Sequence, residues 1–114
     1  MGVSEDLAWA AGLFEGEGCI TMNVNRASSP VRYYPKAVLI TADEDVLLRF
    51  AGILGCGRVG THPHKEGAKP LYRWSATSRK DFMAFSVLLG SKLGARRTAR
   101  LAEVMETSGY ACAA

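Results

Sequence analysis

The hydrophobic period of the chain changes at Gly18, and this change constrains the fold more than any other feature of the sequence. Residues 5–15 are mostly small or apolar and follow Ser4, which predicts a helix that Ser4 caps. From Ile20 to Asn25, apolar side chains alternate with uncharged polar ones, which predicts a strand with one apolar and one polar face. A helix therefore leads directly into a strand, with two glutamates close to the junction.

Turn residues and hydrophobic spacing divide the rest of the chain into further elements. We expect, in order, a loop over 26–35, a strand over 36–42, a helix over 44–54 capped by Asp43, strands over 57–62 and 71–77 joined by a loop, a helix capped by Ser78, and a last helix after Gly94. The order α, β, β, α, β, β, α, α is typical of an α+β fold. In such a fold a four-stranded antiparallel or mixed sheet carries its helices on one face.

The composition is that of one ordinary globular domain. The 114 residues are 48% hydrophobic and 22% charged, enough for one hydrophobic core but not for two, so we expect a single domain over 1–114. The net charge of +3 favours polyanionic partners. No apolar run approaches the roughly 20 residues that span a bilayer, and the cysteines lack disulfide or zinc spacing. We therefore expect a soluble, cytoplasmic or otherwise intracellular protein with no membrane partner.

The predicted sheet has a second face that no helix is left to cover. Alternation along the strands places these polar and basic side chains on it: Thr21, Asn23, Asn25, Arg58, His62 and Arg73. Each of them alone could be ordinary solvated surface. Together they form an uncovered polar face, which indicates a ligand-binding surface.

The stretch from Ala10 to Gly18, AAGLFEGEG, resembles the nine-residue motif of the LAGLIDADG homing endonucleases. The two acidic positions of the motif fall on Glu15 and Glu17. The identical positions are Ala11, Gly12, Leu13 and Gly18. The resemblance continues through the polar-faced strand, through GCGRVG and YRWSATSRKDF, and into a basic helix near the end. It implies the αββαββα unit of this family, whose sheet forms a saddle.

The resemblance implies a site-specific double-strand DNA endonuclease that hydrolyses phosphodiesters with divalent metal ions at a long, near-palindromic site. Two motif helices pack side by side in this family, so one motif in one chain implies a homodimer. Small residues spaced by four, such as Gly12 and Gly16, allow two helices to approach closely. The implied interface residues are Ala8, Ala11, Gly12, Glu15 and Gly16, with Glu15 bracing the helix pair. A gene carried by a mobile intron, intein or phage element would fit this family.

Glu17 is the metal-binding acid that the resemblance implies, with the Gly16 carbonyl as a second ligand. A carboxylate at the negative end of a helix dipole is unfavourable unless a cation neutralises it, and oxygen ligands suit Mg²⁺ or Mn²⁺. We expect Ca²⁺ to support DNA binding without cleavage. His62 and His64 lack a third ligand nearby in the sequence, so we assign them no metal.

The family usually adds a basic residue to the catalytic site. The candidates in this chain are Lys92, Arg96 and Arg97. Ala95 occupies the position where a lysine is often found, and Ala42 or Asp43 stands where a polar residue often ends the second strand. Both departures leave slow or lost cleavage open, and the arginines can equally form a solvated helix face.

The polar face is expected to lie in the major groove of double-stranded DNA, where asparagine reads adenine and arginine reads guanine. The base-reading candidates are Thr21, Asn23, Asn25, Arg58, His62 and Arg73. Residues in or beside the predicted loops are candidates for contacts with phosphates or outer bases: Arg26, Arg32, Tyr33, Lys36 and Lys65.

Two other functions remain open at this point. A non-catalytic DNA-binding regulator or an RNA maturase can share the fold, and the missing basic and polar partners favour that function. A small α+β ligand-binding domain would instead show no affinity for nucleic acid.

Overall fold

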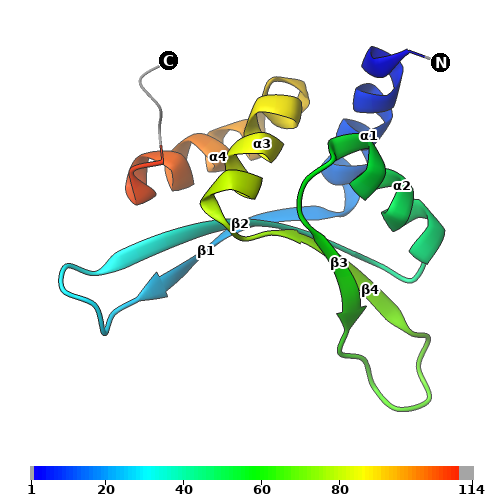
Figure 1. The fold of residues 1–114 in the computed structure, drawn as a ribbon, viewed down its shortest axis with the longest axis horizontal. Helices are drawn as coiled ribbons and strands as arrows, with labels where there is room; N and C mark the ends of the chain where they lie inside the picture. Colours follow the sequence, from blue (N-terminus) through cyan, green and yellow to red (C-terminus); the bar gives the residue numbers. More distant parts are fainter. Residues whose placement is uncertain (1, 111–114) are drawn as a thin grey trace.

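A computed structural model describes residues 2–110, and its elements follow the predicted order (Figure 1). The helices are α1 (Val3–Glu17), α2 (Glu44–Leu54), α3 (Arg79–Leu89) and α4 (Ala95–Ser108), with a short 3₁₀ turn, η1 (Gly90–Lys92), between the last two. The strands are β1 (Gly18–Asn25), β2 (Arg32–Thr41), β3 (Arg58–His62) and β4 (Leu71–Ala76). None of the described helices is long and apolar enough to cross a membrane.

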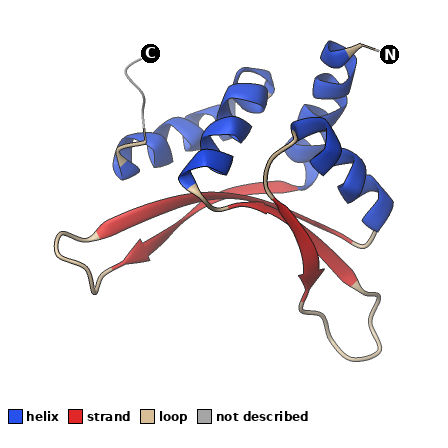
Figure 2. Ribbon diagram, viewed as in Figure 1, coloured by secondary structure: helices blue, strands red, loops and turns tan. Residues whose placement is uncertain are grey.

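The four strands form one antiparallel sheet in the order β1-β2-β4-β3. The helices lie on one side of this sheet, and its other face is open and concave, with the two hairpin arms bent away from the helices (Figure 2). The predicted α+β saddle with helices on one face is confirmed, and its strands are antiparallel throughout. Because β1 is an edge strand, the junction between α1 and β1 lies at an edge of the sheet.

The core between the sheet and the helices is built around aromatic side chains. Five rings from four elements are fully buried: Phe14, Phe50, Trp74, Phe82 and Phe85. Neighbouring ring centroids lie between 4.8 and 6.4 Å apart. The Trp74 indole N–H donates to the Cys56 carbonyl over 2.9 Å, which satisfies its polar atom. Burial, together with the charge of Asp81, raises the pKa of the Cys56 thiol and keeps it neutral.

The residues at the helix N-caps match the sequence-based predictions only in part. Ser78 caps α3 as predicted, because its hydroxyl accepts the backbone N–H three residues on, over 3.1 Å. Asp43 occupies the cap position of α2, but its side chain makes no capping hydrogen bond. The prediction for α1 is wrong: the helix begins at Val3 with Gly2 at the cap position, so Ser4 lies inside the first turn.

Strand β2 begins four residues earlier than predicted. The stretch 32–35, expected in a loop, pairs with β1 from Arg32 opposite Asn25 to Pro35 opposite Met22. Proline is tolerated where a strand lacks a neighbour on one side, and β4 pairs with β2 only from Ala37 onward. The proline and arginine of this stretch predicted a loop. The stretch is a strand because β1 pairs with it.

Candidate nucleic-acid interface

The open face of the sheet carries all of the predicted base-reading residues. In an antiparallel pair, residues directly opposite each other point to the same face. One such row crosses the four strands: Cys19, Val38, Ser75 and Arg58. The base-reading candidates at even spacing from this row share its face: Thr21, Asn23, Asn25, His62 and Arg73.

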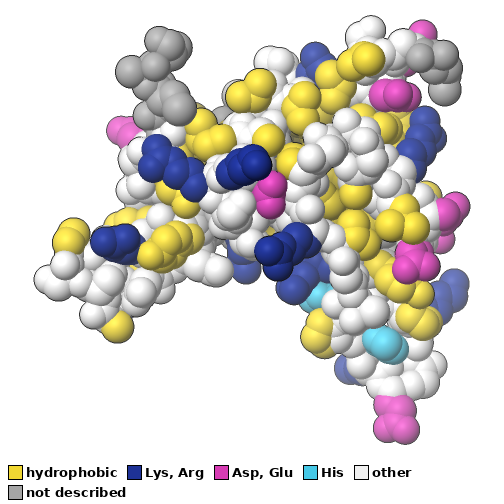
Figure 3. Space-filling view, viewed as in Figure 1, with side chains coloured by type: hydrophobic (Ala, Val, Ile, Leu, Met, Phe, Trp, Pro, Cys, Tyr) yellow, Lys and Arg dark blue, Asp and Glu magenta, His cyan; other side chains and the backbone are white. Residues whose placement is uncertain are grey.

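Basic residues of β2 and of the two hairpin loops border the same surface. Arg32 is the first residue of β2, beside the turn, and stands opposite Asn25 on the open face. Lys36 lies within β2, opposite Thr21 on the same face. Arg26 is exposed in the turn between β1 and β2, and Lys65 is exposed in the loop between β3 and β4. Figure 3 shows a group of Lys and Arg side chains under the middle of the sheet, between the two arms. The concave side is therefore suited to a polyanion.

Tyr33 faces the helices instead of the open side. It pairs with Val24 and lines a hollow of about 380 Å³ with Tyr110, at the end of α4. Its neighbour Tyr34 pairs with Asn23 on the open face and is 38% exposed. If the alternation of the strand is continued back from residue 37, it places Tyr34 on the open face. The sequence predicted a loop there, so this position was not assigned to a face.

The open face also has an apolar part that the sequence analysis missed. Val38 and Ile40 of β2 point to this face, and Leu71 of β4 stands opposite His62 on it. The sequence predicted a strand over 36–42 without assigning its two faces. The register of β2 with β4 shows which side chains of β2 point to the open face.

Two polar atoms of the open face have no partner in the part of the chain that the structure describes. Thr21 Oγ1 and His62 Nδ1 are enclosed by protein and make no hydrogen bond within residues 2–110. Enclosed polar atoms are nearly always satisfied by protein, by water or by a bound molecule. Within residues 2–110 these two atoms are therefore the enclosed side-chain atoms left for a water or a bound molecule to satisfy.

Helix α1 ends at Glu17, and the chain turns at once into β1. Gly18 allows this turn, because a Cβ at its position would lie 2.4 Å from the ring of the buried Phe14. The Gly18 N–H also donates to the Phe14 carbonyl and closes the helix. The turn leaves Glu17 exposed at the edge of the sheet, and its carboxylate forms no hydrogen bond or ion pair within residues 2–110.

Glu15, the other motif acid, is held inside its own chain. Its Oε1 accepts the Gly94 N–H over 2.5 Å, and its Oε2 lies 3.3 Å from the Arg97 Nε. The same Arg97 nitrogen donates to the Glu15 carbonyl over 3.0 Å. Glu15 therefore braces α1 against the start of α4, where the helix dipole favours a negative charge.

The predicted basic residues lie in three different settings. Arg97 is committed to Glu15, and only 15% of its side chain is exposed. Arg96 is exposed and lines a hollow of about 450 Å³ with Gly18 and Cys19, next to the end of α1. Lys92 is exposed and lines a groove along α1 that also includes Glu15. Arg96 and Lys92 are therefore the two exposed basic candidates that border the last turns of α1, and neither forms an ion pair within residues 2–110.

One side of α1 is a flat strip of small residues. Ala8, Gly12 and Gly16 are exposed, and a Cβ on either glycine would meet no atom within 4 Å. A groove of about 420 Å³ follows this strip, bordered by Ser4, Ala8, Ala11, Gly12, Glu15 and Lys92. Ala11 itself is buried in the core and only reaches the edge of the groove. Within the described chain nothing covers the strip.

The described chain supplies only part of a metal site. It contains no group of three or more His, Cys, Asp or Glu side chains that could hold an ion. Glu17 and the Gly16 carbonyl offer oxygen ligands at an exposed helix end. Mg²⁺ takes one or two carboxylates and completes its shell with water and substrate phosphates, so these oxygens fit one half of such a site.

Solved structures resemble this chain, whereas no protein-family profile and no curated protein matches its sequence. The archaeal intron-encoded homing endonuclease I-Vdi141I, complexed with DNA, is 17% identical with a TM-score of 0.74, over 93% of this chain and 68% of that chain. The homing endonuclease I-CvuI, in complex with a DNA target in the presence of Mg, is 17% identical with a TM-score of 0.68, over 90% and 67%. The LAGLIDADG homing endonuclease I-GzeII, in complex with a DNA target, is 13% identical with a TM-score of 0.73, over 90% and 35%.

The fold of the LAGLIDADG homing endonucleases, expected from the motif at Ala10 to Gly18, is confirmed by these similarities. The chain spans about two thirds of I-Vdi141I and I-CvuI and about a third of I-GzeII. Identities of this size establish the fold. The activity has to follow from the residues of the site.

Proposed function

We propose that this chain is a metal-dependent, site-specific double-strand DNA endonuclease that acts as a homodimer at a near-palindromic site. The observation that carries the proposal is Glu17, exposed at the end of α1 and without an ion-pair partner within residues 2–110, at the edge of an open and partly basic sheet face. A protein that only binds DNA gains nothing from a free carboxylate beside a polyanion. A nuclease needs such an acid to hold a metal ion.

The open face supports recognition of DNA in the major groove. Its concave shape, its asparagines and its arginines provide groups that read adenine and guanine edges. The base-reading residues in this proposal are Thr21, Asn23, Asn25, Arg58, His62 and Arg73, and Tyr34 joins them on the same face. Arg26, Arg32, Lys36 and Lys65 would contact phosphates or outer bases and set the affinity.

The strip on α1 supports a dimer. Small side chains let two helices approach closely, and Ala8, Gly12 and Gly16 present no obstacle on the exposed side of α1. Two copies related by a two-fold axis through this strip would bring two Glu17 carboxylates together. Two carboxylates placed together repel each other, and a divalent cation between them removes that repulsion.

Glu17 and the Gly16 carbonyl are the groups that would hold Mg²⁺ or Mn²⁺, with Ca²⁺ supporting binding without cleavage. A divalent ion bound there would polarise the scissile phosphate and lower the pKa of its bound water. Glu15 keeps the end of α1 in place through Gly94 and Arg97. We assign the stabilisation of charge on the phosphate to Arg96, which is exposed beside Gly18 and forms no ion pair within residues 2–110.

A second function is favoured by one specific observation. Arg97 is engaged by Glu15. By the family resemblance, Ala95 stands at the basic position and Ala42 or Asp43 at the polar position that would assist cleavage. A DNA-binding protein of the same fold without activity, or an RNA maturase, would have this pattern. Glu17 is the feature that such a protein would not need.

The two functions differ in what happens to bound DNA. The purified protein is incubated with a randomised duplex library in Mg²⁺, in Mn²⁺ and in Ca²⁺ separately, and both the bound molecules and the cut ends are sequenced. An endonuclease yields recurrent cut ends at a near-palindrome in Mg²⁺ and the same bound but uncut site in Ca²⁺. An enriched site that stays uncut in Mg²⁺ and Mn²⁺ would move the protein to the binding class.

A further inference from the structure

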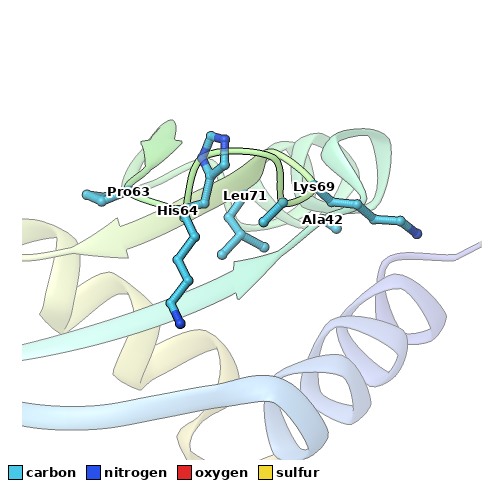
Figure 4. A pocket seen from close by; sticks show the side chains of 7 residues that line it. Ala42, Pro63, His64, Lys69 and Leu71 are labelled. Atoms are coloured by element: carbon cyan, nitrogen blue, oxygen red, sulfur yellow. The ribbon is translucent and has the colours of Figure 1, made fainter.

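A hollow of about 680 Å³ lies at the end of the β3–β4 arm, and the proposed function does not yet use it (Figure 4). Its apolar lining comes from the end of β2, from the start of β4 and from the loop between β3 and β4: Ala42, Pro63, Ala68 and Leu71. Leu71 lies in the middle of it, between His64 and Ala42 (Figure 4). Two lysines of the loop, Lys65 and Lys69, border it. The hollow therefore combines an apolar floor with a cationic rim.

The hollow is continuous with the open face of the sheet. Leu71 stands opposite His62, and both share the face of Arg73, two residues further along β4. Ala42 directly follows the last residue of β2, two positions after Ile40, which also points to this face. A duplex lying on the open face would reach the hollow without any change in the sheet.

The chemistry of the hollow selects among the groups that a duplex presents. The major-groove edges of the bases are donors and acceptors, and the C5 methyl group of thymine is their one apolar group. The alanine, proline and leucine side chains of the lining offer no partner to a donor or an acceptor but match a methyl group, and His64 supplies one polar group beside them. The lysines at the rim complement the phosphates on either side of the base. Because the hollow is wider than one methyl group, the apolar C5–C6 edge of the thymine ring can enter with it.

We propose that this hollow binds the 5-methyl group of a thymine, so that each half of the target contains a T·A pair whose methyl group packs against Leu71. The inference rests on the proposed recognition of DNA by the open face. It adds the identity of one base that the polar residues of the sheet do not read.

Replacing thymine by deoxyuridine tests the contact directly, because only the methyl group is lost. Burying one methyl-sized group contributes about a four-fold difference in affinity. Each thymine of the site enriched from the library in Ca²⁺ is replaced in turn, and the dissociation constant is measured by fluorescence anisotropy. We expect one position in each half-site at which deoxyuridine weakens binding about four-fold.

Protein variants link that position to the hollow. In Leu71→Ala the apolar contact is removed, so deoxyuridine and thymine should bind equally at that position. Leu48→Ala serves as the matched control, because Leu48 is 54% exposed on α2, on the helix-covered side, and should keep the four-fold difference. Ala68→Gln, in the exposed loop, places a polar group at the floor without touching the core and should also abolish the difference.

The possible results distinguish a failure of the thymine contact from a failure of DNA recognition by the open face. If no bound site is enriched, the proposed DNA recognition fails and the inference fails with it. A site can also be bound without any thymine at which deoxyuridine weakens binding and at which Leu71→Ala and Ala68→Gln abolish that difference. In that case the thymine contact is wrong, while DNA recognition by the open face stands.

Discussion

The carboxylate of Glu17 stands at the end of a helix, where the backbone dipole is also negative. That placement is unfavourable for the folded chain alone, since neither a hydrogen bond nor a salt bridge within residues 2–110 offsets it. The proposed endonuclease gives this carboxylate a role outside stability. In the proposed endonuclease that role is to hold a divalent cation.

Replacing Glu17 by glutamine keeps the shape of the side chain and removes its charge. We expect Glu17→Gln to lower the cleavage rate in Mg²⁺ by more than about a hundred-fold, the upper range for loss of a group that only supports a metal ligand. DNA binding in Ca²⁺ should persist, because the polar face is unchanged. Single-turnover cleavage and gel-shift titrations measure the two effects.

Glu106→Gln is the matched control, because Glu106 is exposed in the last turn of α4. It removes the same charge from the protein and should leave cleavage unchanged. Cleavage by Glu17→Gln at the normal rate would remove Glu17 from the mechanism.

Gly18 is required because there is no space for a side chain at its position, and not because of its backbone conformation. A Cβ at Gly18 would overlap the Phe14 ring, so we expect Gly18→Ala to lower the free energy of unfolding by about 1–3 kcal/mol. Gly52→Ala should do the opposite and add about 0.5–1 kcal/mol, because Gly52 lies within α2 with no atom near its Cβ position. Urea denaturation measures both variants, and a neutral Gly18→Ala would show that Phe14 can move aside.

The adjacent arginines of α4 are expected to differ in what they affect. Arg97 donates to the carbonyl and faces the carboxylate of Glu15, so Arg97→Ala should lower the free energy of unfolding by about 1 kcal/mol. Arg96 has no such partner among the described residues, so Arg96→Ala should slow cleavage and leave stability unchanged. Thermal denaturation and single-turnover cleavage of both variants separate the roles. Equal cleavage by Arg96→Ala and the unaltered protein would exclude Arg96 from the proposed site.

At the scale of the elements, helix α1 has one side that packs in the core and another that is exposed. One side of it packs Ala10 and Phe14 into the core, and another carries the strip of Ala8, Gly12 and Gly16. A helix with this division is stable in one chain and still has a side suited to a second helix.

Enlarging the strip tests the dimer without disturbing the core. A Cβ at Gly12 meets nothing in the chain, so the Leu side chain of Gly12→Leu fits the monomer but separates two α1 helices. We expect a monomer in analytical ultracentrifugation, together with loss of cleavage. Ala102→Leu, on an exposed position of α4, is the control and should sediment as the unaltered protein does. A dimer of normal mass from Gly12→Leu would place the interface elsewhere.

At the scale of the whole molecule, the concave basic side predicts strongly salt-dependent binding. Each phosphate contact contributes about 0.9 to the slope of log affinity against log salt concentration. Arg32 lies on the open face of β2, so Arg32→Ala in a homodimer should reduce the slope by about 2. Lys80→Ala, at the start of α3 on the helix-covered side, should leave it unchanged. An unchanged slope for Arg32→Ala would place this residue away from the phosphates.

The sequence alone determined the element order, the open polar face and the motif at the end of α1. These depend on local periodicity and on small sets of neighbouring residues, such as the alternation after Gly18. The tertiary structure decided three other matters. It placed Tyr34 rather than Tyr33 on the open face, engaged Arg97 with Glu15, and joined Ala42, Ala68 and Leu71 in one hollow. Each of these depends on strand register or on contacts between residues far apart in the chain, which periodicity along one segment cannot reveal.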